Sequence, residues 1–474
     1  MLATAQAQSF AGYHNSHYAG IYGVLSNPAS AAGSRYKWDV NIIGADVKGG
    51  NTYASFPKDV LFNFPDSFRR NDNYFLDTAA TRKQNGWGTA EVLMPSALYA
   101  IDEKQSVAFT WRIRSAANGG NINPKTANFF GLDFPNPRFD GNHYSIDYGA
   151  ASVHMWNEFG FTYARVIKDD MIHRWKAGAT LKYLSGIAAG YGVVKDANFT
   201  LNSRTSGTIG SGTMHYAYNM DADHWEEPYM RNYKLFENPG VGLDIGMIYE
   251  WRPDADGFGS YGNNDSYNPD ADEYKVRIGV SVTDIGGIMY DKSNVSADLD
   301  LTSENINPNE LKVKKKESLQ QYGRRLNQLF TPLERKDKFY MTLPTALHVM
   351  ADYNIDGRFF VNANAVVAIT SGKSDYSKTY MMTQLQVTPR FDSKHFGAYL
   401  PLVINKNGQA DAGVGIRIGP LLIGSNSIFS NLFRQRIDHA DAFVALRVIP
   451  IHFNRKERGS GGGRKGQLGC PTNL

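Results

Sequence analysis

The chain has 474 residues, with 42% apolar, 13% aromatic and 20% charged side chains and a formal net charge of +4. This aromatic content excludes a disordered chain, and the sequence contains no run of about 18 apolar residues that could cross a membrane as a helix. The small, scattered charge gives no reason to expect nucleic-acid binding. The single cysteine, Cys470, excludes a disulfide framework. The 46 glycines, 27 tyrosines and 26 phenylalanines favour many strands joined by turns.

Residues 1–9, MLATAQAQS, resemble the end of an export signal. Ala5-Gln6-Ala7 has the small-x-small form of a signal-peptidase site, without the charged and apolar regions that normally precede it. We therefore expect residues 1–7 to be the remnant of a signal peptide. A featureless N-terminus is the alternative.

Residues 8–36 are rich in apolar side chains but lack the long alternation of a strand. The proline of Asn27-Pro28-Ala29 fixes its own backbone and restricts the residue before it, which predicts a turn. The segment is too apolar to remain solvated, so we predict that it forms a plug inside the structure built by the strands that follow. Its apolar side chains are Phe10, Tyr13, Tyr18, Ile21, Tyr22, Val24 and Leu25.

Alternation with period 2 runs through much of the remaining chain. In residues 241–251 the odd positions are apolar, whereas the even positions include Gly242, Asp244, Gly246 and Glu250. Each such stretch has one aliphatic face, with aromatic residues near its ends, and one face of glycine and charged residues. The pattern recurs in 107–113, 175–183, 274–283, 359–369 and 412–418.

The strands and their connections favour a transmembrane antiparallel β-barrel. The alternating stretches reach the length of about 9–11 residues that a tilted strand needs to cross a bilayer. Outer-membrane barrels have short turns at one rim and long loops at the other. Here the tight turns are 102–105, 168–170, 354–357 and 392–394, and the long connections are 115–142, 186–239 and 292–338. We predict an all-β barrel over residues 37–453 in the cell outer membrane, with about 14 strands (12–16). A soluble sandwich or propeller is the alternative.

Proline and capping residues add detail to this barrel. Pro95 and Pro344 are expected to interrupt strands, because proline cannot donate to a ladder. A basic amphipathic helix is predicted over 307–330, where Asn307 can cap it, Pro308 suits its first position and Glu310 completes a capping box. In an outer loop this helix could cover the barrel mouth, touch anionic lipid headgroups or simply pack on neighbouring loops.

The final strand, 442–453, ends at Phe453 before a basic stretch. A terminal strand that ends in an aromatic residue is what the barrel-assembly machinery of outer membranes reads, so that machinery and outer-membrane lipid are expected partners. A bulge is expected at Pro450. The Gly-rich residues 454–474 are expected to form a flexible periplasmic tail.

The run SNPAS at 26–30 resembles the Asn-Pro-Ala motif of FadL-type barrels, the long-chain fatty-acid transporter superfamily. With the strands named below, the chain is similar to a Bacteroidota family of FadL/PorV-like outer-membrane proteins of unknown function. The resemblance implies that the N-terminal segment is a hatch that a ligand displaces. Many such relatives continue into an OmpA-like domain, which is expected to be absent here although residues 469–471 resemble the edge of its linker. The matching strands are 242–251, 282–286, 343–347, 416–424 and 443–453.

In a barrel the charged strand faces must point into the lumen, because a charge on the lipid face costs about 2–4 kcal/mol at the bilayer midplane. These side chains either brace the wall as an ion-pair network or form a polar passage or binding site. The polar residues expected to face the lumen are Arg112, Lys176, Lys182, Asp244, Glu250, Lys275, Arg277, His348, Asp352 and Arg417.

The sequence shows no catalytic constellation, and no cofactor is expected. Asp254 and Asp256 are weak candidates for a metal site in an otherwise solvated acidic loop. The Gly-rich run 257–262 matches a phosphate-binding pattern, but the sequence after it does not begin a helix. His14 and His17 have no third ligand nearby in the sequence.

Three functions remain open. The first is transport of a small hydrophobic or amphipathic solute through an outer-membrane barrel. The second is a non-transporting outer-membrane interaction protein or a PorV-like secretion-system partner. The third is a soluble, exported β-rich protein. None of these is an enzyme.

Overall fold

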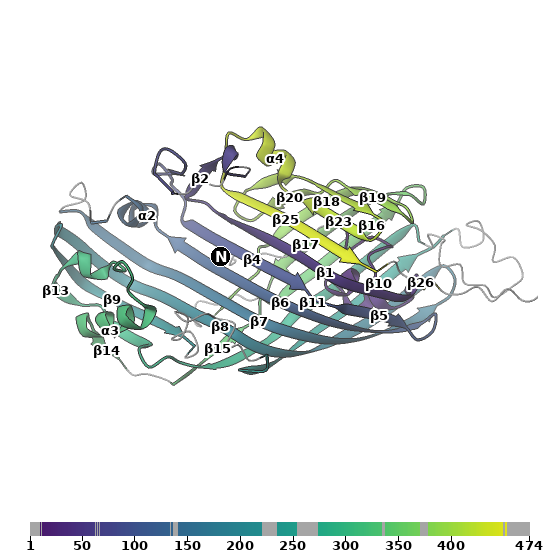
Figure 1. Ribbon diagram of the computed structural model, residues 1–474, viewed down its shortest axis with the longest axis horizontal. Helices are drawn as coiled ribbons and strands as arrows, with labels where there is room; N and C mark the ends of the chain where they lie inside the picture. The colour runs from purple at the N-terminus through teal and green to yellow at the C-terminus, as the bar shows by residue number, and fades with distance from the viewer. Residues whose placement is uncertain are drawn as a thin grey trace, which may run out of the picture.

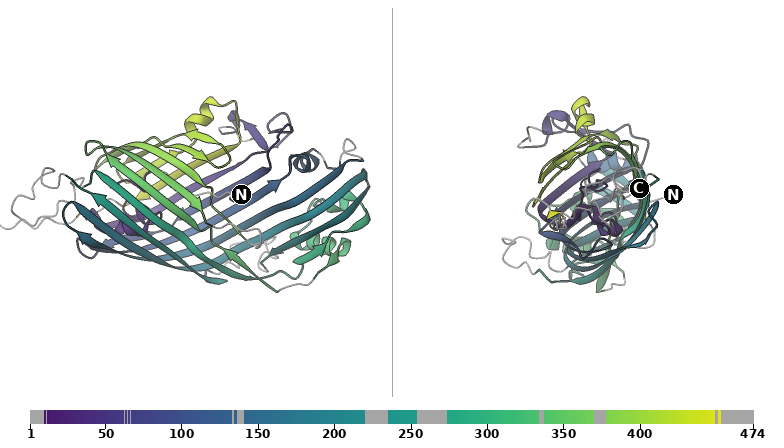
Figure 2. Two further views of the ribbon diagram at one scale, coloured as in Figure 1. Left: turned by 180° about the vertical axis from the view of Figure 1, so that it is seen from behind. Right: turned by 90° about the vertical axis from the view of Figure 1, so that its right-hand side faces the viewer.

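The computed structural model describes residues 10–452, except for residues 11, 62, 64, 66, 133, 136–140, 220–234, 254–273, 334–336, 370–377 and 449–450. Its strands form one continuous wall around a central interior (Figure 1). In the view turned by 90° the wall has a closed outline, and the dark purple residues just before the first strand lie inside it (Figure 2).

Fourteen strand positions make up the ring, and several of them are interrupted. The first seven positions are β1 (Tyr36–Asn51), β4 with β5 (Gln84–Leu93, Ser96–Ala100), β6 (Gln105–Ile122), β7 (His143–Asp169), β8 (His173–Ser203), β9 with β10 (Ser206–Tyr218, Pro239–Trp251) and β11 with β12 and β13 (Val276–Asp291, Ala297–Asp300, Ser303–Ile306). The last seven are β14 with β15 and β16 (Thr331–Pro332, Lys338–Thr342, Ala346–Asn354), β17 (Phe359–Ala368), β18 (Gln384–Asp392), β19 with β20 (Phe396–Tyr399, Leu402–Asn405), β21 with β22 (Ala410–Ala412, Val414–Ile418), β23 (Leu421–Ser425) and β25 with β26 (His439–Arg447, Ile451–His452).

The ring closes between its first and last strands. β1 pairs antiparallel with β25, from Asn41 opposite Arg447 to Gly50 opposite His439. On its other edge β1 pairs antiparallel with β4 and β5. Closure leaves the wall without a free edge, which is the condition for a sheet to lie in lipid. The predicted all-β antiparallel barrel of about 14 strands is therefore confirmed.

The alternation in the sequence sets which face of each strand meets the lumen. In β10, Val241 is 68% exposed and Ile245 45% exposed, whereas Asp244 is 2% exposed and Glu250 3% exposed. Apolar side chains thus point outward and charged ones inward, the reverse of a soluble protein. An outward apolar band on a closed antiparallel barrel is the surface of a membrane-spanning, outer-membrane barrel.

Aromatic pairs mark one rim of this band. Trp38 lies 4.3 Å from Tyr99 between ring centroids, and Trp175 lies 4.8 Å from Tyr249. All four residues lie close to strand ends at the rim that carries the tight turns. Aromatic girdles occupy this position at membrane–water interfaces.

The tight turns at 102–105, 168–170, 354–357 and 392–394 all join strands at that rim, here called the lower rim. Both β1 and β26 also meet there. The opposite, upper rim carries α2 (Pro124–Gly131), α3 (Leu319–Leu329), α4 (Ile428–Phe433), the turn η2 (Lys58–Leu61) and a three-stranded sheet of β2 (Ala54–Pro57), β3 (Phe75–Leu76) and β24 (Arg436–Ile437). By the usual arrangement the lower rim is periplasmic and the upper rim extracellular.

The upper rim is uneven, because β7 and β8 run for 27 and 31 residues whereas β17 and β18 run for 10 and 9. The tall part, here called the extension, comprises the upper halves of β7 and β8 with β9, β12, β13 and β14. The expectation that residues 186–239 form a long loop is wrong for 186–203 and 206–218, which are β8 and β9. These residues form strands because β9 pairs with the upper part of β8 along one edge and with β12 and β13 along its other edge.

Both prolines interrupt strands as expected, Pro95 between β4 and β5 and Pro344 between β15 and β16. The helix expected over 307–330 is divided. Asn307 does cap a turn that starts at Pro308, but this is only the 3-10 turn η5 (Pro308–Leu311). Glu310 instead pairs with Lys314 at 2.9 Å. α3 starts afresh after Ser318, which forms a capping box with Gln321.

Near the C-terminus β26 pairs with β1, whereas Phe453 and residues 454–474 lie outside the described part. Among the helices of the described part, none combines the length and apolarity needed to cross a membrane.

Candidate functional site

Residues 12–35, here called the N-terminal segment, fold back into the lower lumen as turns and two short helices, α1 (Ile21–Val24) and η1 (Pro28–Ala31). Asn27 is extended and caps η1, because its side-chain oxygen accepts a hydrogen bond from the Ala29 amide at 3.0 Å. Pro28 occupies the first position of the turn, where its missing N–H costs nothing. The predicted Asn27-Pro28-Ala29 turn is present.

Polar contacts tie this segment to strands all round the ring. The side-chain amide of Asn27 donates to the backbone carbonyls of Met247 on β10 and Val280 on β11, at 3.1 and 3.3 Å. The Ile21 amide donates to Asp39 of β1 at 2.7 Å. The Asn15 amide donates to Asn362 of β17 at 2.9 Å, and Arg447 of β25 donates to the Tyr18 carbonyl at 2.6 Å. The segment thus spans the lower lumen from wall to wall.

Apolar packing accompanies these bonds. Phe10, Tyr13, Ile21 and Tyr22 are at most 1% exposed. They share one core cluster with wall residues Leu93, Leu98, Ala108, Ala164, Val166, Tyr399, Leu422, Phe443 and Ala445. On β8, a Cβ added to Gly178 would lie 2.6 Å from the Pro28 carbonyl carbon, so the wall strand and the turn fit only with glycine there.

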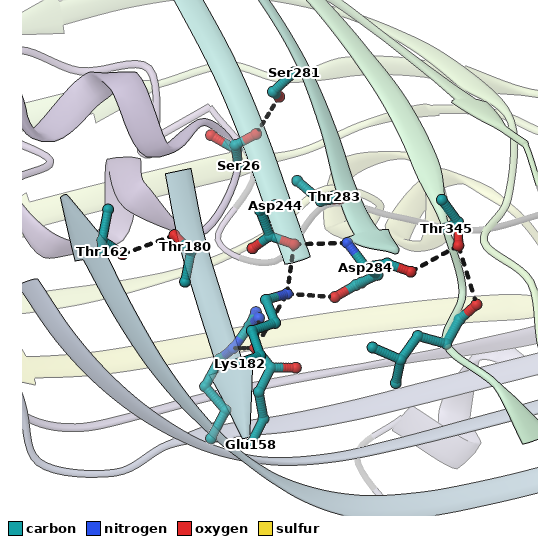
Figure 3. A network of polar contacts seen from close by, with 12 residues as sticks. Ser26, Glu158, Thr162, Thr180, Lys182, Asp244, Ser281, Thr283, Asp284 and Thr345 are labelled. Atoms are coloured by element: carbon teal, nitrogen blue, oxygen red, sulfur yellow. Dashed lines mark hydrogen bonds and ion pairs between the residues drawn. The ribbon is translucent and has the colours of Figure 1, made fainter. Parts of the chain in front are cut away.

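Above the segment lies a set of seven buried charges, here called the central ion network. The ammonium of Lys182 on β8 lies 2.7 Å from Asp244, 2.6 Å from Asp284 and 3.3 Å from Glu158 (Figure 3). Arg114 lies 3.0 Å from Glu158 and 2.8 Å from Asp284. Arg112 and Glu91 complete the network. Every member is 6% exposed or less.

Three cations and four carboxylates therefore meet inside the barrel, and each has an opposite charge or hydrogen-bond donor in reach. A buried charge without a partner is strongly destabilising, so these side chains can be buried only because they pair with one another. Asp284 reaches the network because its backbone is left-handed, with φ 61°. Its amide donates to Asp244 at 2.6 Å, and its carbonyl accepts from Thr345 at 2.6 Å, which hold that conformation (Figure 3).

A second group of charges lies beside the N-terminal segment. Lys176 pairs with Glu250 at 2.6 Å, and Arg277 pairs with Asp352 at 3.4 Å. Arg277 also donates to the Asn15 carbonyl. The Arg417 guanidinium lies 4.9 Å from the centre of the Tyr18 ring. His348 bonds Thr283 at 2.9 Å in the upper part of the same lumen.

Nine of the ten residues expected in the lumen are accordingly buried inside the wall. Lys275 is not. β11 begins only at Val276, so the alternation does not extend to this position. The Lys275 ammonium donates to the Ile355 carbonyl at 3.1 Å and lies 5.0 Å from the centre of the outward Tyr353 ring. The alternation over 274–283 puts Tyr274 on the apolar face with Val276 and Ile278, which predicts a lipid-facing side chain. Tyr274 is instead 3% exposed and donates to Asp352.

The sequence did not predict three members of the central ion network, Glu91, Arg114 and Asp284. It also did not predict Arg390 of β18, which donates to Asp352 at 2.6 and 2.7 Å. Arg114 shares the inward phase of Arg112 two residues earlier, so alternation would have found it. Asp284 carries no such signal, because a register shift in the β10–β11 ladder changes its phase.

The weak metal candidates gain no support. Asp254, Asp256 and the run 257–262 lie outside the described residues. His14 bonds Asn364 at 3.1 Å, and His17 stacks on Tyr274 with 4.5 Å between ring centroids. The described residues contain no group of three or more His, Cys, Asp or Glu placed to hold a metal ion.

A different kind of site lies in the extension. A cavity of about 210 Å³ is bounded by the extension strands, α2 and α3. Its lining has no charged side chain among the described residues and includes only two threonines and one tyrosine as polar groups. The lining is Phe129, Phe130, Phe134, Ile146, Val194, Ala197, Phe199, Thr200, Leu201, Gly207, Thr208, Ile209, Met214, Leu301, Ile306, Pro308, Leu311, Tyr322, Leu326 and Phe330.

The helix α3 that covers this cavity is held firmly. Leu326 is 3% exposed and packs into the cavity wall. Arg325 hydrogen-bonds Glu317 at 2.8 and 2.6 Å and the Lys312 carbonyl at 2.8 Å. The hydrogen bond from Arg325 lowers the pKa of Glu317 below its usual range. Sequence reasoning found the amphipathic helix but not the cavity, whose walls come from segments far apart in the chain.

Comparisons with known proteins identify a family that the sequence matches and several solved structures of low similarity. The model described as "Family of unknown function (DUF5723)" matches residues 28–426. No curated protein sequence matches the chain. Among solved structures, a FadL homologue of Pseudomonas aeruginosa has 9% identity and a TM-score of 0.43, covering 94% of this chain and 99% of that one.

Two toluene transporters are similar to a comparable degree. TbuX of Ralstonia pickettii has 10% identity and a TM-score of 0.41, covering 91% of this chain and 94% of that one. TodX of Pseudomonas putida has 11% identity and a TM-score of 0.40, covering 92% and 95%. These values are too low to transfer a residue role or a solute to this chain. The resemblance to PorV and to a Bacteroidota family stays a prediction.

Proposed function

The chain belongs to the DUF5723 family of unknown function and inherits no activity from it, so we propose from its architecture that it carries a small hydrophobic or amphipathic solute across the outer membrane. In this proposal the apolar cavity of the extension captures the solute, and the N-terminal segment is the plug that closes the lower lumen. No catalytic role is assigned to any residue.

The cavity is the observation that carries the proposal. Sites for drug-sized ligands measure about 300–1,000 Å³ and are mostly apolar. A cavity of about 210 Å³ whose described lining residues carry no charge suits a smaller apolar molecule. It lies at the extracellular end, where a solute arrives. Burying apolar surface in it is favourable by about 25 cal/mol per Å².

The charged lumen supports a bracing role more than a polar passage. Each charge of the central ion network is matched by partners within the wall, which leaves little binding capacity for a solute. We infer that the network holds the barrel in shape, and that the C-terminal strand guides assembly by the barrel-assembly machinery. Outer-membrane lipid surrounds the apolar band.

Solute uptake by intact cells with and without the protein in their outer membrane tests the proposal, because a plain lipid bilayer is already permeable to apolar solutes. We expect faster uptake of radiolabelled toluene or a medium-chain fatty acid by cells that contain the protein, with glycerol unaffected. Ile209→Asn places a polar group in the cavity lining, where Ile209 is 8% exposed, and should reduce the uptake. Val313→Asn, at a 65% exposed position on the same rim, is the matched control.

Equal uptake with and without the protein would overturn the transport proposal. Folded protein in that result would favour the second function, a non-transporting interaction protein or secretion-system partner. Pull-down from solubilised outer membranes would then be the next experiment.

A further inference from the structure

A short piece of chain between β17 and β18 crosses the lumen above the central ion network. It comprises residues 378–382 and is here called the strap. Ser152 of β7 donates to the Lys378 carbonyl at 2.7 Å. Asn118 of β6 donates to the Tyr380 carbonyl at 3.1 Å and accepts from the Tyr380 amide at 3.0 Å.

The ring order shows that these bonds reach across the barrel. β17 and β18 are the ninth and tenth strand positions, whereas β6 and β7 are the third and fourth. In a ring of 14, positions six apart lie almost opposite one another. Asn118 and Ser152 are themselves paired across β6 and β7, so they offer one anchoring point on the far wall.

The strap is partly buried, and it is also held at its near end. Thr379 is fully buried and donates to the Thr342 carbonyl at 3.2 Å, and Met382 is 2% exposed. Lys378 forms a β-bridge with Thr342 of β15. The backbone of Tyr380 lies in a part-buried position, and the side-chain amide of Asn118 supplies it with one donor and one acceptor.

A chamber of about 60 Å³ lies between the strap and the N-terminal segment. Tyr380 and Met381 of the strap line it on one side, and His14 and Tyr22 of the N-terminal segment on the other. Its wall includes Thr89 of β4 and members of the central ion network. A space of this volume holds a few water molecules and no larger solute.

We propose that the strap is a second closure of the lumen, in series with the N-terminal segment, and that Asn118 and Ser152 are the residues that determine whether a solute can pass it. This inference rests on the proposed transport function. With both closures in place, a solute entering from the extracellular side is stopped above the chamber. Release of the strap joins the chamber to the upper lumen.

Thiol labelling tests the strap without any solute, so its result can be read even if transport fails. With Cys470→Ser as background, Thr89→Cys places a single thiol in the chamber. A charged, membrane-impermeant methanethiosulfonate reagent is added outside intact cells. We expect slow labelling, and much faster labelling when Asn118→Ala and Ser152→Ala are added.

The matched control is Asn198→Ala with Ser211→Ala, which removes the same side-chain types from the extension, where they bond each other at 3.0 Å. This control should label as slowly as the parent. Ser152→Ala alone removes one hydrogen bond and should be labelled at an intermediate rate. This single variant replaces the double variant in the test if the double variant does not assemble.

Fast labelling of the parent, or equal rates in the parent, the strap variants and the control, would overturn the proposal. Labelling that rises only when residues 12–35 are removed would likewise show that the N-terminal segment is the sole barrier.

Discussion

The guanidinium of Arg114 on β6 donates two hydrogen bonds to the carboxylate of Asp284 on β11, at 2.8 and 2.9 Å. These strands are the third and seventh positions of the ring, so the pair joins parts of the wall that share no ladder. Such a link resists flattening or widening of the barrel in a way that backbone pairing between neighbours cannot.

Removal of this carboxylate should destabilise the barrel strongly. Asp284→Ala leaves Arg114 and Lys182 with fewer opposite charges in a buried site, and breaking a buried pair costs about 3–5 kcal/mol. The free energy of unfolding, from urea titration in lipid vesicles, measures the effect.

Lys83→Ala is the control for that change, because the Lys83–Asp147 pair is exposed and 4.0 Å long. An exposed pair contributes about 0–1 kcal/mol. Equal losses in the two variants would contradict the bracing role of the central ion network.

Neighbouring residues on β10 should respond in opposite ways. Ile245→Arg places a charge on the lipid face and costs about 2–4 kcal/mol near the midplane, so assembly should be blocked. Asp244→Asn keeps the side-chain shape and an oxygen that can accept from the Asp284 amide, and Lys182 still has Asp284 and Glu158 as opposite charges, so the barrel should still assemble. Heat-modifiable migration on gels distinguishes assembled from unassembled protein, and equal tolerance would contradict the assignment of the two faces.

The N-terminal segment should loosen when its cap is removed. Asn27→Ala removes the bond to Ala29 and both bonds to the wall, each worth about 0.5–1.5 kcal/mol net. Protection of the segment from added protease should fall. Asn123→Ala removes a similar cap, that of α2, which accepts from Lys125 at 3.0 Å, and should leave the N-terminal segment protected.

A steric change on the wall should displace the same segment. Gly178→Ala places a methyl group against the backbone of Pro28 and Ala29, 2.6 and 2.7 Å from the nearest atoms. Trypsin cleavage after Arg35, which is 7% exposed, should become faster. Gly88→Ala on β4 meets nothing closer than 3.8 Å and should have no effect. Unchanged cleavage in Gly178→Ala would mean that the segment is not seated against β8.

The alternation of apolar and polar residues predicted much of this fold, because a charged side chain on the lipid face of a strand is destabilising. The faces of β10 follow directly from Val241, Asp244 and Ile245. The prediction failed where a strand starts, at Lys275, and where a ladder continues beyond the membrane, at β8 and β9. In both places the backbone pairing decides, and the pairing depends on a distant strand.

The sequence predicted less of the candidate sites than of the fold. The inward charges could be identified one by one, but their partners depend on ring positions that alternation does not give. The contact between Asn118 and Tyr380 joins residues 262 apart in the chain. The apolar cavity likewise exists only because α2 and α3 return to the same strands.

We infer that the chain's own N-terminal segment and the strap together fill the lumen of the membrane-spanning barrel, and the conductance of the unaltered protein in planar lipid bilayers is the measurement that checks this. We expect no steady water-filled conductance. Deletion of residues 8–36 should raise the conductance, and the rise should be larger when Asn118→Ala and Ser152→Ala are added. A large, steady conductance from the unaltered protein would contradict this arrangement.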